Sequence, residues 1–373
     1  MAVTGPKQAA IFAACAFFSL LFSQFSIAAS KTAEPMPMPM PIKVVVVSMF
    51  EHGDVVGDEP GEFQFWIERF PLPTKHDFPA GPYPLYSNDR GVLGICLGGG
   101  IANATASIMA LGLDGRFDLA NAYFLIAGIA GGDPQDTTLG SAVWANHIVD
   151  GDLLYEIDAR EIPENWPYGL IPLGGSEPAD EPEDLSTGWS LDTIHFPLDE
   201  RLTTWAYELT RSMTLKDTPE MASFRARYTN YPNAQKPPVV SMGATLSAST
   251  YWHGERMNRW ANDWTKLYAG SNANFVTSNM EDSGTLTALT RLGRLGKVKP
   301  ERTLVLRTVS NFTTPPAQQL ASSSATQPYA NGGQPSLIAA FEVGRTVVEA
   351  LLADKYDKYI EVKNDTSNST ADN

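Results

Sequence analysis

Short runs of apolar, often β-branched residues recur along the chain and alternate with segments of helical periodicity. Continuous apolar runs are typical of strands covered on both faces, whereas apolar residues three and four apart indicate amphipathic helices. The runs predict seven strands, at residues 44–47, 91–97, 122–126, 140–149, 239–248, 275–279 and 303–309. The helical spacing predicts helices at residues 102–111, 198–213, 221–227, 254–269 and 336–353.

This alternation predicts an α/β fold with a mixed, mainly parallel central sheet flanked by helices. Sheets of this kind bind ligands at the carboxyl ends of their strands. Residues 159–238 interrupt the alternation with prolines and acidic side chains, and we interpret them as an elaboration of a single domain at residues 42–355. Residues 356–373 are predicted to form a disordered tail, because charged, Ser, Thr and Asn residues dominate there.

The first 28 residues have the layout of a secretory signal peptide: Lys7, an apolar run at residues 9–22, and small residues around Ala28. An uncleaved anchor is the alternative, for which the run is short, since a membrane-spanning helix needs about 20 apolar residues. Residues 29–41 repeat Met-Pro three times and are predicted to be a spacer. We therefore expect an exported protein (secreted, periplasmic or on the cell surface) with no membrane insertion once the signal is removed.

The formal net charge of −15 argues against a nucleic acid polymer as partner. Of the two cysteines, Cys15 lies in the predicted signal and Cys96 in an apolar run, where we interpret it as a core residue. The sequence contains no HExxH motif, no Gly-x-Ser-x-Gly motif and no cysteine–histidine cluster, so neither a zinc hydrolase nor an esterase is predicted. His52 and Asp54 beside Glu51 indicate either an acid/base or metal-binding group or a solvated loop.

Glycine-rich turns follow three of the predicted strands, at residues 53–57, 98–100 and 128–132. Glycine allows a ligand to approach the backbone closely, although each turn alone is also ordinary strand-end geometry. Another candidate follows the strand at 275–279, where Met280 and Glu281 precede a helix. A carboxylate there is placed to accept hydrogen bonds from the vicinal hydroxyls of a ribose, or else to cap the helix and compensate its dipole.

Together, six segments of the chain resemble the purine nucleoside permease family and, more distantly, the nucleoside phosphorylase and nucleosidase superfamily. The resemblance spans about residues 42–353, and the six segments are Val44–Glu51, Gly98–Asn103, Ala127–Gly132, Ser247–His253, Met280–Glu281 and Ser310–Asn311. It implies a nucleoside phosphorylase-like fold and a purine nucleoside as the small-molecule partner. It also implies a homo-oligomer, because relatives are commonly oligomers.

The resemblance also implies roles for particular residues. Glu281 would hold the ribose hydroxyls beside Met280, and Tyr251 or Trp252 would flank the base. Where many relatives carry an acid that protonates the leaving purine, this chain has Asn311, which would instead donate a hydrogen bond to the base. Glu51 is the candidate that orients or deprotonates an attacking water. The remaining expected contacts with the substrate are Gly100, Asn103, Gly128 and Ser249.

The function expected from these residues is cleavage of the N-glycosidic bond of purine nucleosides in support of uptake or salvage. Hydrolysis is favoured over phosphorolysis because the glycine turn at residues 98–103 carries no arginine, leaving only the remote Arg69 and Arg90 to bind phosphate as a co-substrate. No other cofactor and no metal is expected. The rival hypotheses are a nucleoside-binding protein of an uptake system and a surface or storage protein that has lost its site.

Overall fold

The computed structural model describes residues 38–179, 192–361 and 363. The predicted signal peptide, most of the spacer and residues 364–373 of the predicted tail lie outside these ranges. Residues from Met40 onwards belong to one compact unit. Within the described ranges, no helix is both long enough and apolar enough to cross a bilayer.

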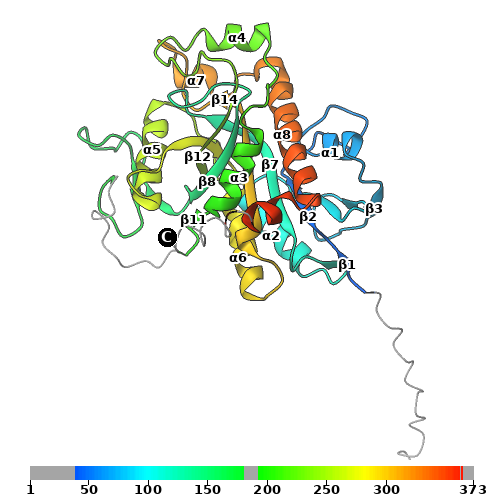
Figure 1. Cartoon of the computed structure of the whole chain (residues 1–373). Coiled ribbons are helices and arrows are strands. Elements are labelled where there is room, and N and C mark those ends of the chain that lie inside the picture. Colours follow the sequence, from blue (N-terminus) through cyan, green and yellow to red (C-terminus); the bar gives the residue numbers. More distant parts are fainter. Residues whose placement is uncertain (1–37, 180–191, 362, 364–373) are drawn as a thin grey trace, which may run out of the picture. The chain divides into compact units, whose positions relative to one another are not determined.

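The elements alternate as the apolar pattern predicts, with short strands added (Figure 1). The strands are β1 (Met40–Pro41), β2 (Val44–Ser48), β3 (Thr74–His76), β4 (Leu85–Ser87), β5 (Val92–Cys96), β6 (Phe117–Asp118), β7 (Tyr123–Gly132), β8 (Ala142–Asp150), β9 (Leu154–Glu156), β10 (Leu170–Pro172), β11 (His195–Pro197), β12 (Val240–Ser247), β13 (Phe275–Asn279) and β14 (Thr303–Phe312). The α-helices are α1 (Gln64–Arg69), α2 (Ile101–Gly112), α3 (Glu200–Thr210), α4 (Pro219–Arg225), α5 (Glu255–Ala269), α6 (Asp282–Arg294), α7 (Ala321–Ser324) and α8 (Gln334–Leu352).

Ten of the described strands form a mixed sheet with the path β11-β8-β12-β13-β7-β2-β5-β4-β3, to which β14 adds by pairing with both β7 and β8, while β1 with β6 and β9 with β10 form two separate two-stranded sheets. Strand β2 pairs in parallel with β5 and β7, β12 with β8 and β13, and β14 with β7. Because β14 bridges β7 and β8, the strands β8, β12, β13, β7 and β14 close a ring. The predicted mixed α/β architecture with a parallel-rich sheet is confirmed.

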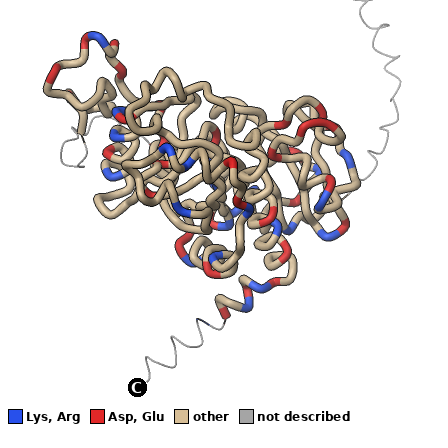
Figure 2. Tube along the Cα trace, turned by 90° about the horizontal axis from the view of Figure 1, so that it is seen from above, with Lys and Arg blue, Asp and Glu red and all other residues tan. Residues whose placement is uncertain are grey.

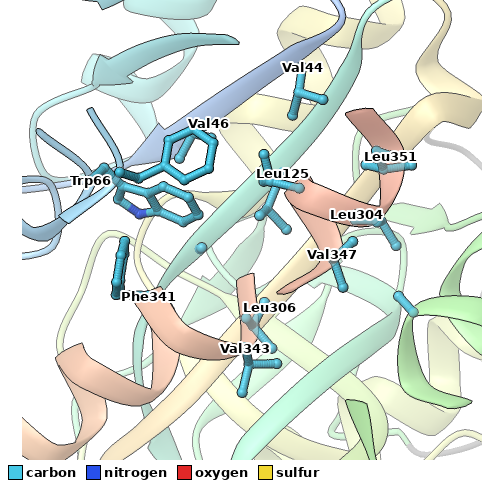
Figure 3. Close-up of a cluster of buried hydrophobic side chains, with 14 of the residues drawn as sticks. Val44, Val46, Trp66, Leu125, Leu304, Leu306, Phe341, Val343, Val347 and Leu351 are labelled. Carbon is cyan, nitrogen blue, oxygen red and sulfur yellow. The ribbon is translucent and has the colours of Figure 1, made fainter. Parts of the chain in front are cut away.

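Strand β2 separates two hydrophobic layers, because successive side chains of a strand point to opposite faces of the sheet. Val44 and Val46 pack in one layer with Leu125, Trp66 of α1 and a row of α8 side chains (Figure 3). Val45 and Val47 belong to a second layer that includes residues of α2 and α6. Each fully buried aliphatic side chain contributes about 1.5–3 kcal/mol to folding, so these layers fix the strands whose ends carry the cavity described below.

Two predicted boundaries differ from what the structure shows. The last two residues of the expected spacer form β1, which pairs with β6. Residues 355–361, mostly assigned to the disordered tail, are helical, and the ring of Tyr356 lies 5.2 Å from that of Trp205 in α3. Aromatic burial of this kind compensates for a polar composition. The expected elaboration at 159–238 contributes β10, β11, α3 and α4 to the same compact unit.

Charged side chains are spread along the described chain, with Lys and Arg interleaved among Asp and Glu (Figure 2). The whole sequence has 42 acidic and 27 basic residues, so the protein has a net negative field. This field disfavours the approach of polyanions and slows the association of anionic ligands.

A pair of half-buried histidines joins the edge strand β11 to β8. His147 Nδ1 and His195 Nε2 are 3.1 Å apart, and burial lowers the pKa of both rings, that of His195 to about 4. Between about pH 4 and the ordinary pKa of 6.5 the unfolded form of His195 therefore binds more protons than the folded form, and the contribution of this pair to stability falls on acidification. We expect the pair to make the melting temperature more sensitive to acid between pH 7 and pH 4.5 than that of a variant that lacks it.

The comparison that checks this expectation is thermal unfolding of His195→Phe, which cannot titrate at that position. The variant is expected to lose less stability between pH 7 and pH 4.5 than the wild type loses. An equal loss in both proteins would show that the histidine pair does not cause the acid sensitivity.

Candidate active site

A cavity of about 500 Å³ opens where strands β2, β7, β12, β13 and β14 end. Its wall includes Met49 after β2, the stretch 129–131 of β7, residues 250–252 after β12, residues 278–281 around the end of β13, and residues 310–313 of β14. Gly332, Gly333 and Leu337 add the beginning of α8. Most contributing strands run parallel to a neighbour, so their carboxyl ends meet here, as expected for an open α/β sheet.

Glu62 is a buried carboxyl group in the wall of this cavity, with 5% of the residue exposed. Its Oε2 accepts a hydrogen bond from the Met49 backbone N–H at 2.8 Å, and its Oε1 accepts one from the Ile129 N–H at 2.7 Å. Burial raises the pKa of Glu62 to about 8, Arg307 partly opposing the rise and Glu281 adding to it. A carboxyl group that titrates close to neutral pH is suited to moving a proton.

Arg307 of β14 is the buried cation beside these carboxylates, and the residue is 1% exposed. Its Nε donates to Asp282 Oδ2 at 3.0 Å, its Nη2 donates to Asp282 Oδ1, and its Nη1 donates to the Ile129 carbonyl at 3.2 Å. Nη2 also lies 3.5 Å from Glu281 Oε2. Burial disfavours the charge of Arg307, but the surrounding carboxylates hold its pKa above the ordinary value. Arg307 thus links Asp282 and Glu281 by direct contacts and acts on Glu62 through its charge.

Glu281 lies at the start of α6 without capping the helix through its side chain. Asn279 does so instead, because its Oδ1 accepts from the N–H groups of Glu281 and Asp282 at 3.0 and 2.9 Å. The Glu281 carboxylate accepts from the Gly100 and Met280 N–H groups, both at 3.2 Å. Burial raises its pKa, with Arg307 opposing the rise. The sequence left two roles open for Glu281, binding a ribose or capping α6. Its side chain does not cap the helix, and the residue lines the cavity.

Asn311 belongs to a polar network with two tyrosines in the cavity wall. Its Nδ2 donates to the Tyr251 hydroxyl at 2.9 Å and to the Phe312 carbonyl at 3.3 Å, and its Oδ1 accepts from Ser310 Oγ at 3.0 Å. Burial raises the pKa of Tyr251, and Tyr329, its hydrogen-bond partner, adds to the rise. This part of the wall therefore offers neutral hydrogen-bonding groups next to aromatic faces.

Of the residues expected at the site, five line the cavity: Tyr251, Trp252, Met280, Glu281 and Asn311. Gly100 and Ser249 do not line the cavity. Gly100, with φ of 91°, takes a conformation that favours glycine and directs its N–H to Glu281, while Ser249 Oγ accepts from the Ile101 N–H at 3.2 Å. Asn103 is exposed, and its Nδ2 donates to the Gly99 carbonyl at 2.8 Å, outside the cavity wall.

Glu51, expected to act on water, does not line the cavity. Its carboxylate accepts hydrogen bonds from three backbone N–H groups, those of Gly61 at 3.2 Å, Phe63 at 2.6 Å and Gln64 at 3.1 Å. These bonds close the loop at residues 51–61 and hold the entry to α1. The neighbouring His52 does line the cavity and is exposed at its rim.

Gly128, also expected to touch the substrate, instead makes room for Glu62. A Cβ atom at this position would lie 2.0 Å from Met49 Cε and 2.4 Å from Glu62 Oε1. We expect Gly128→Ala to displace the Glu62 carboxylate and to destabilise the fold by about 1–3 kcal/mol, the usual cost of overpacking a core.

Thermal unfolding checks this prediction, with Gly115→Ala as the matched control because nothing lies within 4 Å of a Cβ built there. The control is expected to melt close to the wild type. A Gly128→Ala protein that melts with the control would contradict the packing described here.

The residues of the wall or its support that the sequence did not single out include Glu62, Arg307 and Tyr329. Arg307 left a signal, because a lone arginine inside the apolar run 303–309 must find a buried partner. Glu62 follows a loop of variable geometry, and Tyr329 lies in a segment without periodicity, so neither had a comparable signal. Among the described residues, no group of three or more His, Cys, Asp or Glu side chains is arranged to hold a metal.

Comparison of the sequence with known families decides where the chain belongs. A sequence model described as purine nucleoside permease (NUP) matches residues 41–363. The chain belongs to the purine nucleoside permease family. A probable purine nucleoside permease of Schizosaccharomyces pombe is 35% identical over 222 residues, 58% of this chain and 62% of the relative. A purine nucleoside permease of Candida albicans is 32% identical over 271 residues, 69% of this chain and 65% of the relative. This family member therefore spans slightly less than two thirds of the relatives it matches.

Solved structures similar to this purine nucleoside permease family member include a nucleosidase and a hydrolase. A 5'-methylthioadenosine/S-adenosylhomocysteine nucleosidase from Neisseria meningitidis is 16% identical with a TM-score of 0.46, covering 84% of this chain and 99% of that one. A futalosine hydrolase of Helicobacter pylori is also 16% identical, with a TM-score of 0.47 and coverage of 84% and 98%.

Proposed function

We propose that this purine nucleoside permease family member cleaves the N-glycosidic bond of purine nucleosides with water. The observation that carries the proposal is the presence, in one cavity of about 500 Å³, of two buried carboxyl groups, Glu62 and Glu281, whose charges act on each other and on the buried Arg307. Cleavage of a glycosidic bond develops positive charge on the sugar and needs a group that activates water. Glu281 and Glu62 are suited to these two needs.

Glu281 is our candidate for holding the ribose. Its carboxylate accepts hydrogen bonds from two backbone N–H groups, both at 3.2 Å, and lies 3.5 Å from Arg307 Nη2. It therefore still has lone pairs that can accept hydrogen bonds from vicinal hydroxyls. Its negative charge also stabilises the positive sugar carbon of the transition state. The network of Gly100, Met280 and Arg307 keeps the carboxylate in place before the substrate binds.

Glu62 takes the role that the sequence suggested for Glu51. Its pKa of about 8 leaves a fraction of the side chain ionised at neutral pH, ready to accept a proton from water as the oxygen attacks the sugar carbon. The two backbone N–H groups that it accepts fix its orientation. The purine leaves with the electron pair of the broken bond as an anion, which Asn311 and the tyrosines stabilise by hydrogen bonds. The proton that Glu62 took from water is returned to the purine through solvent, which completes the hydrolysis.

Water is favoured over phosphate as the nucleophile because no Lys or Arg belongs to the cavity wall among the described residues. Arg69 lies over the Phe65 ring, 4.1 Å from its centroid, and Arg90 pairs with Glu349 of α8. Arg307 is buried, and its N–H groups already donate hydrogen bonds to Asp282 and to the Ile129 carbonyl. A phosphate dianion would therefore have to bind without a cation, beside two carboxyl groups.

The second candidate is a nucleoside-binding protein that performs no chemistry. The observation that favours it is the amide at Asn311, which can hydrogen-bond a purine but cannot protonate it. Under either function we propose export, based on residues 1–28, and a role next to uptake or salvage. Sequencing the amino terminus of the native protein tests export, with a start near residue 29 expected.

The experiment that separates the functions is incubation of the purified protein with inosine, adenosine and guanosine, with and without phosphate, followed by chromatography of bases and sugars. Free ribose in the absence of phosphate supports hydrolysis. Ribose 1-phosphate formed only with phosphate replaces hydrolysis by phosphorolysis. Intact nucleosides that nevertheless bind in calorimetry support the second candidate.

A further inference from the structure

The loop at residues 51–61 brings an additional acidic side chain to the cavity. Glu59 lines the cavity and is exposed, as is its loop neighbour His52, so both belong to the rim rather than to the buried wall. Glu62 and Glu281 provide carboxyl groups deeper inside, each less than 9% exposed. Among the described wall residues these three carboxyl groups are accompanied by no lysine or arginine.

The position of Glu59 is fixed by the loop that carries it. The Glu51 carboxylate, at the start of the loop, accepts hydrogen bonds from three backbone N–H groups at and just beyond its end. Gln64 Nε2 donates to the Asp58 carbonyl at 3.3 Å. The Asp58 carboxylate in turn accepts from the Asp54 N–H at 2.9 Å. Asp54 and Asp58 are also exposed, so the loop adds negative charge around Glu59.

We infer that the loop at 51–61 is a charge filter that admits nucleosides and rejects nucleoside 5'-phosphates, with Glu59 as the residue that determines this specificity. The inference rests on the proposed function and names its substrate class. A phosphate group brings about two negative charges and strong acceptor oxygens, which need Arg, Lys or free backbone N–H groups. A carboxylate at the rim repels it, and the repulsion is screened less inside a cavity than in open water.

Glu51 acts in this account as a positioning residue. It does not itself line the cavity, yet its three hydrogen bonds hold the loop that presents Glu59. Arg307, buried beside the site, does not offset the filter for a bound phosphate, because Asp282 and Glu281 already neutralise its charge.

Calorimetric binding of inosine and inosine 5'-phosphate to the wild type, Glu59→Lys and Asp89→Lys tests the inference. Asp89 is exposed outside the cavity wall, so Asp89→Lys makes the same change in net charge elsewhere. We expect the wild type and Asp89→Lys to prefer inosine by at least about tenfold, equivalent to about 1.4 kcal/mol. Glu59→Lys is expected to reduce that preference about tenfold, and added salt to reduce it in the wild type.

Equal affinity of the wild type for both compounds would overturn the inference, and so would an unchanged preference in Glu59→Lys. Binding does not require cleavage, so inosine that is bound selectively but left intact would contradict the proposed enzyme activity while upholding the filter. Absence of any nucleoside binding would overturn both.

Discussion

Glu62→Gln is expected to lower kcat/KM for inosine by about 10²–10⁴-fold while leaving inosine binding within a few-fold of the wild type. General base catalysis contributes rate factors of this size, and glutamine cannot take a proton from water. The Glu62 carboxylate now accepts hydrogen bonds from the backbone N–H groups of Met49 and Ile129. Glutamine has only one acceptor oxygen, so one of these two hydrogen bonds is lost in the variant. The measurement is steady-state kinetics beside calorimetric binding, with the melting temperature as a check of folding.

The pH dependence gives an independent test of Glu62. Because its pKa is raised to about 8, kcat/KM of the wild type should rise with pH and level off above about pH 8 as the base becomes ionised. The effect on stability has the opposite sign. Between the ordinary pKa of 4.5 and about 8 the folded chain holds a proton that the unfolded chain has lost, so stability falls as pH rises.

Glu62→Gln removes both dependences if they belong to this residue. Its stability relative to the wild type should therefore improve from pH 5 to pH 8, and its residual activity should vary little over that range. A wild-type profile that is flat between pH 6 and pH 9, or a variant that retains the rising limb, would assign the base role to another group.

The second large effect is expected for Glu281→Gln, which should lower kcat/KM for inosine by about 100-fold. Hydrogen bonds to a charged acceptor contribute about 1.5–3 kcal/mol each, and the variant replaces a charged acceptor of two hydroxyls by a neutral amide. The size is kept, so Gly100 and Met280 retain an acceptor nearby. The measurement is kcat/KM for inosine and for 2',3'-dideoxyinosine with both proteins.

The dideoxy compound makes the assignment specific to the ribose hydroxyls. It has no hydroxyls for Glu281 to hold, so the variant should lose much less on it than on inosine. An equal loss on both compounds would mean that Glu281 acts through the structure of the cavity or through the charge of Arg307, and not by binding the hydroxyls.

The fold was largely predictable because its main strands are buried on both faces. The runs Val44–Val47 and Val92–Cys96 have no polar interruption, and the structure confirms both as strands. The edge strands β3 and β11, and β4 beside β3, have three residues each, too few to show a period. Helix α1, with six residues, escaped prediction for the same reason.

The site was predictable where function coincides with a strand end and its motif. Glu281 lies just after the predicted strand at 275–279, and Asn311 lies just after the one at 303–309. Both residues line the cavity. Glu51 and Glu62 could not be told apart, because a loop of uncertain geometry separates two acidic residues that both follow the first strand. Only the structure shows that the Glu51 carboxylate is used by three N–H groups, whereas Glu62 lines the cavity.

The most direct test of the account mixes inosine with the wild type and with Glu62→Gln in phosphate-free buffer and follows release of hypoxanthine by absorbance, with binding measured in parallel. We predict that both proteins bind inosine. The wild type should release hypoxanthine and ribose, whereas Glu62→Gln should release almost no hypoxanthine. If both proteins bind inosine and neither releases the base, the cavity is a nucleoside-binding site without the proposed chemistry.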